Sequence, residues 1–380
     1  MKRIEKLPRD NWQATVASQG LVYHTGPDGQ AYWNEAAYYR FKSGEVDVLE
    51  AATIELQACC MAVAENVIEN DRLTEIGIPI EAQDRIRWSW DADQRGIYGR
   101  FDLVYDGGGP PKMLEYNADT PTTLVEGAVA QYYWMEDCFP HADQFNSIWE
   151  GLVEAWKSMR VERVLQGDTL YFASGDNPED WMTIRMLRDT AEEAGVRTAE
   201  IFMEAIGWDT GQRLFVDADN RVIRSIFKLY PWEWLLKDAF GAHALETYPQ
   251  TRWIEPIWKL VLSCKGILPV LWEMFPGHPN LLPCYADSPR DMASYVAKPI
   301  FAREGANITA HTPEGEIQTP GRYAEYPSVY QELCPLPNFD GNHPVIGSWV
   351  INGEPHGIGI RESDGLITDN LSRFVPHIFE

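Results

Sequence analysis

A short run of alternating residues, interrupted by a glycine- and proline-rich turn, is the feature that most constrains the fold of this chain. Residues 99–126 read GRFDLVYDGGGPPKMLEYNADTPTTLVE. FDLVY and KMLEYN alternate as strands do, and DGGGPP is a turn cluster, so the stretch predicts a β-hairpin. Pairing centred on the glycines puts Asp102 opposite or almost opposite Glu115. Side chains two apart share one face of a strand, so Asn117 and Arg100 join that face.

The shared face of the hairpin is a candidate metal site. Asp102, Glu115 and Asn117 offer three oxygen donors without sulfur or histidine, a set that suits Mg²⁺ or Mn²⁺ rather than zinc. The alternative is a polar face that simply meets solvent, as is usual on antiparallel sheets. Two features favour the metal site: the turn brings the strand ends together, and the carboxylates sit in otherwise apolar strands.

The hairpin is followed by NADTPTTLVEGAVAQYYW, which predicts a turn that leads into a helix. Asp119 or Thr120 would cap this helix, and Pro121 suits its first turn. The first backbone N–H groups of the helix could then face an anion.

Charge and composition exclude several classes of partner. The chain has 380 residues and a net charge of −25, which repels nucleic acid and anionic membranes, although the acidity is equally explained as an aid to solubility. The six cysteines lack CxxC or zinc spacing, which favours reduced thiols. The chain shows neither a signal-peptide apolar region nor an apolar run of membrane-spanning length. We therefore expect a soluble cytoplasmic protein without nucleic-acid or membrane partners.

The spacing of apolar residues predicts the principal elements. Residues 46–70 form a long helix, because apolar residues recur every three or four positions. RIRWSW, at residues 85–90, alternates and predicts a short strand. Residues 168–202 read as strand, helix and strand, which is one βαβ unit of a parallel sheet. Residues 213–230 return to an antiparallel pattern. Residues 255–275 predict an apolar helix that ends around Gly266 and Pro269.

The βαβ unit has a polar edge. Its helix opens at Pro178, with Asp176 or Asn177 as the expected cap. Ligands of such units bind beyond the carboxyl ends of the strands, which makes this edge a candidate substrate site. The candidates there are Ser174, Asp176, Glu179 and Asp180. The alternative is a well-capped helix whose acids merely favour its positive end.

Four scattered cations complete the pattern. YVAKPIFAREGANITA predicts a strand–loop–strand lid carrying Lys298 and Arg303, where glycine permits close approach to phosphates. Lys265 near the end of an apolar helix, and Arg361 at the end of a glycine-rich strand, are either structural or further phosphate contacts. A divalent site together with phosphate-sized cations is what ATP chemistry requires.

The motifs resemble a known family. RFDLVYDGGGPPKMLEYNADTPTTLVE, PIWKLVLSCKGILPVLWEMFPGHPNLLP, YVAKPIFAREGANI and GSWVINGEPHGIGIRE are similar to the synthetase domain of glutathionylspermidine synthase and its stand-alone bacterial acid–amine ligase relatives. The resemblance covers nearly the whole chain. It implies an α+β and α/β architecture: an ATP-grasp fold with an additional α/β, pre-ATP-grasp-like substrate lobe. The expected parts are residues 1–130 with the metal hairpin, an inserted substrate lobe at 131–212, and nucleotide-binding lobes at 213–380.

The resemblance also implies residue roles. Arg100 is similar to the catalytic residue that holds an acyl phosphate. The implied Mg²⁺ ligands are Asp102, Glu115 and Asn117. The implied ATP contacts are Lys265, Lys298 and Arg361, with Arg303 in a closing loop and Gln331 and Glu332 on the strand that meets adenine. The implied substrate contacts are Thr120, Thr122, Glu179 and Asp180.

The implied activity is an ATP- and Mg²⁺-dependent ligation of a small, peptide-like carboxylate to an amine through an acyl phosphate. Nothing corresponds to the amidase domain of the synthase, so product hydrolysis is not expected. Arg373 stands roughly where the synthase has an acid that holds the polyamine. Two alternatives stay open: a non-catalytic nucleotide-binding relative, and a glycoside hydrolase with paired carboxylates. The sequence specifies neither the acid, the amine nor the oligomeric state.

Overall fold

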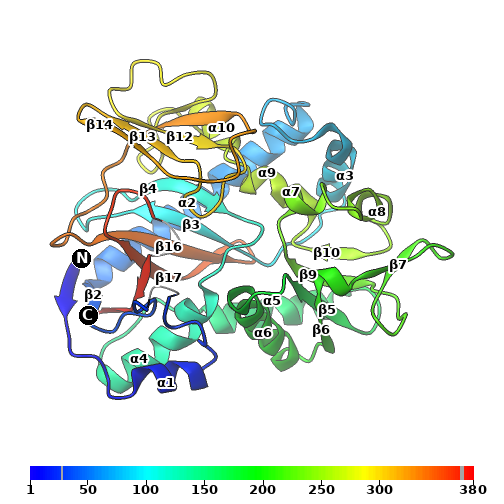
Figure 1. Ribbon diagram of the computed structural model, residues 1–380, viewed down its shortest axis with the longest axis horizontal. Helices are drawn as coiled ribbons and strands as arrows, with labels where there is room; N and C mark the ends of the chain where they lie inside the picture. Colours follow the sequence, from blue (N-terminus) through cyan, green and yellow to red (C-terminus); the bar gives the residue numbers. More distant parts are fainter. Residues whose placement is uncertain (27–28, 369–371) are drawn as a thin grey trace.

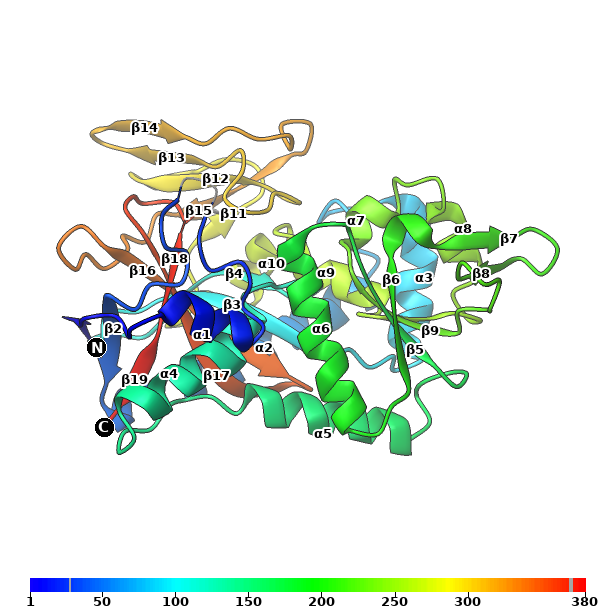
Figure 2. The same ribbon diagram turned by 60° about the horizontal axis from the view of Figure 1, so that its bottom comes forward.

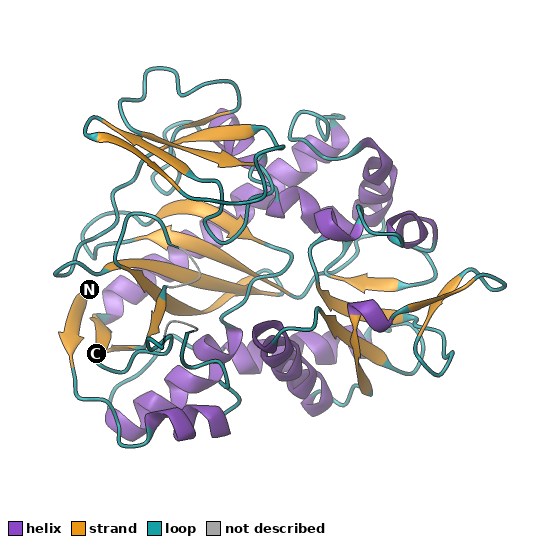
Figure 3. Ribbon diagram, viewed as in Figure 1, coloured by secondary structure: helices purple, strands orange, loops and turns teal. Residues whose placement is uncertain are grey.

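The computed structural model describes residues 1–26, 29–368 and 372–380. Three sheets dominate the described chain (Figures 1 and 3). The central sheet is antiparallel and has the order β18-β17-β16-β3-β4. Its strands are β3 (Tyr98–Val104), β4 (Lys112–Asn117), β16 (His343–Ile351), β17 (Glu354–Ser363) and β18 (Arg373–Val375).

A second antiparallel sheet faces the central one and lies above it in Figures 1 and 2. Its order is β11-β15-β12-β13-β14. Its strands are β11 (Cys284–Tyr285), β12 (Tyr295–Pro299), β13 (Thr309–Thr312), β14 (Gly315–Gln318) and β15 (Ser328–Glu332).

The third sheet is parallel and forms a separate α/β lobe on the right of Figure 1. Its order is β10-β9-β5-β6, with strands β5 (Leu170–Ser174), β6 (Thr198–Phe202), β9 (Ser225–Leu229) and β10 (Arg252–Ile254). Helices α5 (Ile148–Val161) and α6 (Pro178–Glu193) pack against each other beside it. The sheet joins strands from both sides of residue 212, which the sequence suggested as a domain boundary.

The remaining elements surround these sheets. Near the two termini, β2 (Ala37–Phe41) pairs with β1 (Lys2–Glu5) and β19 (His377–Phe379). A separate two-stranded sheet consists of β7 (Gly207–Asp209) and β8 (Leu214–Val216). The other helices are α1 (Trp12–Ser18), α2 (Ser43–Glu69), α3 (Ile80–Asp91), η1 (Glu126–Ala130), α4 (Gln131–Cys138), η2 (Met203–Ala205), α7 (Trp232–Leu235), α8 (Gly241–Glu246), η3 (Ile257–Lys259), α9 (Leu260–Ser263) and α10 (Ile267–Met274). Among the described residues, none of these helices is both long and apolar enough to cross a membrane. All six cysteines are free thiols.

Several predictions from local pattern are confirmed. The hairpin is β3–β4, and Asp102 pairs directly with Glu115. The long helix is α2. The βαβ unit is β5–α6–β6 with parallel pairing, and the cap of α6 is Asn177, whose Oδ1 accepts the Asp180 N–H at 2.8 Å.

One prediction of a strand is wrong and another is confirmed only in part. Residues 85–90 lie in α3, because Ala82, Gln83, Ile86 and Ser89 are buried at helical spacing and outweigh the local alternation. Within residues 213–230, an antiparallel bridge joins Val216 to Val222, and β8 also pairs antiparallel with β7. The longer strand β9, however, runs parallel between β5 and β10. Pairing partners in sheets are set by distant segments that local pattern does not contain.

One prediction about helices is confirmed in part and another is wrong. Residues 255–275 do not form one helix, but the chain breaks between α9 and α10 at Cys264–Gly266, close to the helix end expected around Gly266. A Cβ at Gly266 would lie 2.3 Å from the Ile76 carbonyl oxygen, so this close approach needs glycine. Asp119 and Thr120 do not cap the helix that follows the hairpin. Asp119 instead accepts the N–H of Trp232 at 2.9 Å, at the start of α7.

Candidate active site

A cavity of about 450 Å³ lies where the three sheets meet. The central sheet contributes β3, β4 and β17, the second sheet contributes β12, β13 and β15, and the parallel lobe contributes the loops after β5 and β9. Of the site residues predicted from the sequence, Ser174 and Asp176 do not line this cavity. The others all do: Arg100, Asp102, Glu115, Asn117, Thr120, Thr122, Glu179, Asp180, Lys265, Lys298, Arg303, Gln331, Glu332 and Arg361.

Asp102 is held by two guanidinium groups. Arg100 Nε donates to its Oδ1 at 2.7 Å, and Arg361 Nη2 donates to its Oδ2 at 2.6 Å. Arg100 also reaches the loop beyond the hairpin, where its Nη1 donates to the Thr122 carbonyl at 2.6 Å. Such charge-assisted bonds fix both the carboxylate and the arginines that face the cavity.

Glu115 lies beside two lysines. Lys265 Nζ is 2.9 Å from its Oε2, and Asn117 Nδ2 donates to its Oε1 at 3.1 Å. Burial raises the pKa of Glu115, but Lys265 and Lys298 lower it more, so the net pKa is well below the ordinary range. The same Asn117 amide lies 3.4 Å from Asp102 Oδ2, so the three predicted metal ligands lie together. Glu115 is therefore an anion across the whole neutral range.

A β-bulge in the hairpin positions Lys298. The register shifts after Asp102, which leaves Leu114 outside the ladder. The free Leu114 carbonyl accepts Lys298 Nζ at 3.1 Å, and Gln331 Oε1 accepts the same ammonium at 2.7 Å. Gln331 is buried beneath the ammonium, whereas Glu332 is exposed at the cavity edge. Burial lowers the pKa of Lys298, whereas the negative charge of Glu115 raises it, and the net effect is a decrease.

The loop after β12 closes one side of the cavity. Arg303 Nε donates to Glu233 Oε1 at 2.7 Å, and its Nη1 donates to Thr120 Oγ1 at 2.8 Å. The carbonyl of Ala302 accepts Lys265 Nζ at 2.6 Å. The helix break at Gly266 is thus what brings Lys265 against this loop.

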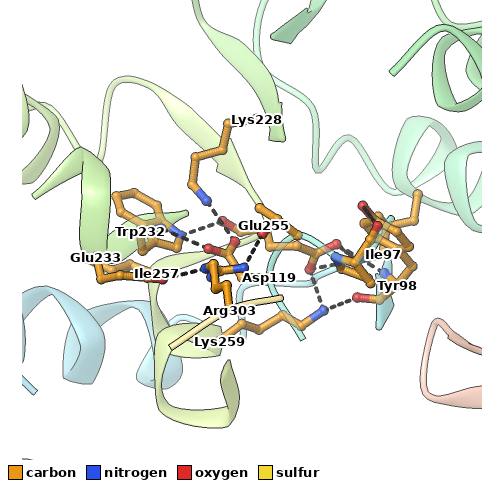
Figure 4. A network of polar contacts seen from close by, with 12 residues as sticks. Ile97, Tyr98, Asp119, Lys228, Trp232, Glu233, Glu255, Ile257, Lys259 and Arg303 are labelled. Carbon is orange, nitrogen blue, oxygen red and sulfur yellow. Dashed lines mark hydrogen bonds and ion pairs between the residues drawn. The ribbon is translucent and has the colours of Figure 1, made fainter. Parts of the chain in front are cut away.

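A buried polar network supports Arg303 and the start of β3 (Figure 4). Asp119 and Lys228 are both fully buried and lie 2.7 Å apart, and Asp119 also accepts the Trp232 N–H at the start of α7. Glu255 accepts the N–H of Ile97 at 2.9 Å. These contacts fix the parallel lobe to the β3–β4 hairpin and place Glu233 opposite Arg303.

Acidic side chains form a second group of charges along the cavity wall. Glu179 and Asp180 come from the first turn of α6, and Glu204 and Glu304 also line the cavity. The pKa of Glu179 is raised to about 7, chiefly by burial and further by Glu126, Asp180 and Glu304, against an opposing hydrogen bond from Thr122. We call this group of acids the acidic end of the cavity, and the group of Arg100, Lys265, Lys298, Arg303 and Arg361 its cationic end.

Sequence reasoning missed several residues of the site. Glu233, Lys228 and Glu126 are buried charged groups in apolar segments, and Tyr32 lines the cavity from an irregular segment. A lone charge within SIFKLY or TLVEGAVA was the available signal. Its partner could not be identified, because each partner comes from a distant part of the chain.

The donors on the hairpin suit a hard divalent cation. The described residues contain no group of three His, Cys, Asp or Glu side chains that could hold a metal. The candidate set has two carboxylates and one amide, all with oxygen donors, gathered across adjacent strands at the cavity wall. This composition fits Mg²⁺, which is usually held by one or two carboxylates together with substrate phosphates.

Comparisons with known proteins show what the whole chain is similar to. A family model described as "Glutathionylspermidine synthase preATP-grasp" matches residues 3–380. A Haemophilus influenzae protein named "Putative acid–amine ligase" is 37% identical over the full length of both chains. Trypanothione synthetase of Crithidia fasciculata is 30% identical over 82% of this chain and 52% of its own length. The bifunctional glutathionylspermidine synthetase/amidase of Escherichia coli is 27% identical over 98% of this chain and 62% of its own.

Proposed function

The chain belongs to the glutathionylspermidine synthase family, and from this premise we propose that it joins a peptide-like carboxylate to an amine through an acyl phosphate, using ATP and Mg²⁺. Family membership itself makes the protein an ATP-dependent acid–amine ligase with the ATP-grasp architecture expected from the sequence. The mechanism, the metal, the substrates and the residue roles belong to the proposal.

The observation that carries the proposal is the polarity of the cavity. One end has five cations, namely Arg100, Lys265, Lys298, Arg303 and Arg361. The other end has four acids, namely Glu179, Asp180, Glu204 and Glu304. A triphosphate and a carboxylate suit the first end, and a protonated amine suits the second. A glycoside hydrolase would have no use for so many cations, which disfavours that alternative.

The residues of the cationic end have distinct tasks. Lys298 and Lys265 are held by carbonyl and amide oxygens, so their positions are set before nucleotide binds. Preorganised charges of this kind stabilise charge that develops on a transferred phosphoryl group. Arg100 and Arg361 orient the substrate carboxylate and hold the charge of the acyl phosphate. Bound through Asp102, Glu115 and Asn117, Mg²⁺ would supply neutralisation of phosphate charge.

The acidic end then receives the amine. Names of relatives include glutathionylspermidine synthetase and trypanothione synthetase, so glutathione and polyamines are the first substrates to test. Arg373, noted in the sequence near the expected polyamine site, lies in an ion pair with Asp364 at 2.7 Å and does not line the cavity. It therefore need not repel a polyamine bound there.

The test is ADP release with pools of peptide-like acids and amines, including glutathione and spermidine, with mass detection of the product. The proposal predicts ADP, phosphate and an amide, all dependent on Mg²⁺. Lys298→Met should weaken ATP binding while keeping the apolar stem, and Lys157→Met, at an exposed position of α5, is the matched control. ATP binding without ADP release for any pair would support the alternative of a non-catalytic relative.

A further inference from the structure

Glu126 is a buried acid that the handling of phosphates does not explain. It begins η1, a π-helical turn of the kind that often marks a functional position, and it is fully buried. Its Oε1 accepts the Tyr32 hydroxyl at 2.7 Å. Its Oε2 has no hydrogen-bond partner among the described residues. A buried oxygen without a partner is costly, so a structural role alone is a poor reason for an acid here.

Glu126 lies behind the cavity wall, because it is fully buried and its partner Tyr32 lines the cavity together with Glu179. Burial raises the pKa of Glu126, but the Tyr32 hydrogen bond and the charges of Arg100 and Arg361 oppose this increase. Besides burial, the groups that raise the pKa of Glu179 are Glu126, Asp180 on its own helix and Glu304 from the loop after β12. As a carboxylate, Glu126 thus adds negative charge to the surroundings of Glu179.

The two acids of α6 are not equivalent. The backbone N–H of Asp180 binds Asn177 Oδ1, and its Oδ2 accepts Asn177 Nδ2 at 2.5 Å, so Asp180 is part of the helix cap. Glu179 takes no part in the cap. It is instead connected to Arg100 through Thr122, which hydrogen-bonds Glu179 with its side chain and accepts Arg100 Nη1 with its carbonyl. Glu179 is therefore the acid nearer to the place where an acyl phosphate would be held.

We propose that Glu179 accepts the proton that the attacking ammonium must lose, and that Glu126, acting across Tyr32, is the positioning residue that keeps Glu179 able to accept it. This inference rests on the proposed ligase function. A protonated amine has no lone pair with which to attack, so one proton must leave first.

The step balances as follows. R–NH₃⁺ gives a proton to the Glu179 carboxylate, which becomes a neutral acid, and R–NH₂ remains. The nitrogen lone pair forms the bond to the acyl carbon, and the bond from that carbon to the phosphate oxygen breaks. Phosphate leaves with that electron pair and takes the second amine proton as HPO₄²⁻. The proton on Glu179 returns to solvent.

The test exchanges the nucleophile. Hydroxylamine is uncharged at neutral pH and needs no proton acceptor, whereas spermidine does. With ATP, Mg²⁺ and glutathione as the acid, Glu179→Gln should lower kcat with spermidine by about 10²–10⁴-fold, while hydroxamate formation changes by only a few fold. Asp180→Asn should raise the KM for spermidine but leave the pH dependence of kcat in place.

The outcomes separate the two proposals. Equal loss of both reactions in Glu179→Gln, or an unchanged kcat with spermidine, overturns the role of Glu179. If the wild type forms neither the spermidine amide nor the hydroxamate, the result counts against the proposed function with this acid. The role of Glu179 is then tested by a measurement that needs no substrate.

This measurement is an infrared titration of the carboxyl groups of the protein without substrate. The difference between wild type and Glu179→Gln should show a carboxyl group that titrates at about pH 7, and Glu126→Gln should shift it to lower pH. If Glu126→Gln fails to fold, Tyr32→Phe serves instead, because loss of its hydrogen bond favours the neutral form of Glu126. A Glu179 that titrates near its ordinary value of 4.5 in the wild type overturns the proposal.

Discussion

The two ends of the cavity treat the same kind of side chain in opposite ways. At the hairpin, Lys265 and Lys298 surround Glu115 and hold its pKa well below the ordinary range, although burial acts in the other direction. At the first turn of α6, burial and neighbouring acids raise the pKa of Glu179 to about 7. Glu115 is thus compensated by lysines before any ligand binds, whereas the charges that act most strongly on Glu179 are those of other acids. The difference teaches that one cavity can be preorganised for phosphate and left incomplete for its second substrate.

The largest expected effect is the loss of stability when one partner of a buried ion pair is removed. Asp119→Ala leaves the fully buried Lys228 without its carboxylate and should lower the free energy of unfolding by about 3–5 kcal/mol. The exposed pair of Lys237 and Glu325 is the matched control, where Glu325→Ala should cost less than about 1 kcal/mol. Urea denaturation measures both. Similar losses for the two variants would show that burial does not distinguish them.

Glu115 offers the corresponding test of function. Glu115→Gln removes the charge that Lys265 and Lys298 face, and with it a proposed metal ligand, so ADP release should fall by about 10²–10³-fold. Circular dichroism should show an intact fold. Glu314→Gln, at an exposed position of the β13–β14 turn, is the control and should retain full activity. Wild-type ADP release by Glu115→Gln would break the assignment of the hairpin.

At the acidic end, removal of the charge of Glu179 should raise the free energy of unfolding and not lower it. Because the folded-state pKa of Glu179 is raised from 4.5 to about 7, its favourable contribution is present below pH 4.5 and is lost as pH rises through about 7. Glu179→Gln, which mimics the neutral acid, should therefore be more stable than the wild type at about pH 8, by about 1–3 kcal/mol. The two proteins should converge near pH 4. Urea denaturation at both pH values checks this, and a less stable variant at the higher pH would contradict it.

More of the hairpin end of the cavity than of the acidic end could be predicted from the sequence. Strand alternation and the DGGGPP turn were enough to pair Asp102 with Glu115, because a hairpin is a local structure whose register its turn fixes. The cations were visible as residue types in their loops. The sequence could not show that Arg361 joins Arg100 on Asp102, or that Glu233 holds Arg303, because the contacts of Arg361 and Glu233 join residues far apart in the chain.

The acidic end depends on long-range packing even more. Glu179 and Asp180 were identifiable as a helix start, but their different proposed roles follow from the Asn177 cap and from the buried Glu126, which lies far from them in the chain. The insertion of β9 between β5 and β10, which the antiparallel pattern of residues 213–230 did not suggest, places Lys228 beneath the cavity. Residues 85–90 show the same limit, since burial in α3 overrode a convincing alternation.

Transfer of oxygen between the acid and phosphate tests the central claim most directly. The enzyme is incubated with ATP, Mg²⁺, spermidine and an acid substrate whose carboxylate oxygens are both ¹⁸O, and glutathione is the first acid to test. The ¹⁸O content of the released inorganic phosphate is then measured by mass spectrometry. An acyl phosphate formed at the cationic end and opened by an amine at the acidic end predicts one ¹⁸O atom in each phosphate released with the amide. Amide formation with unlabelled phosphate, or with AMP and pyrophosphate in place of ADP, would contradict the account.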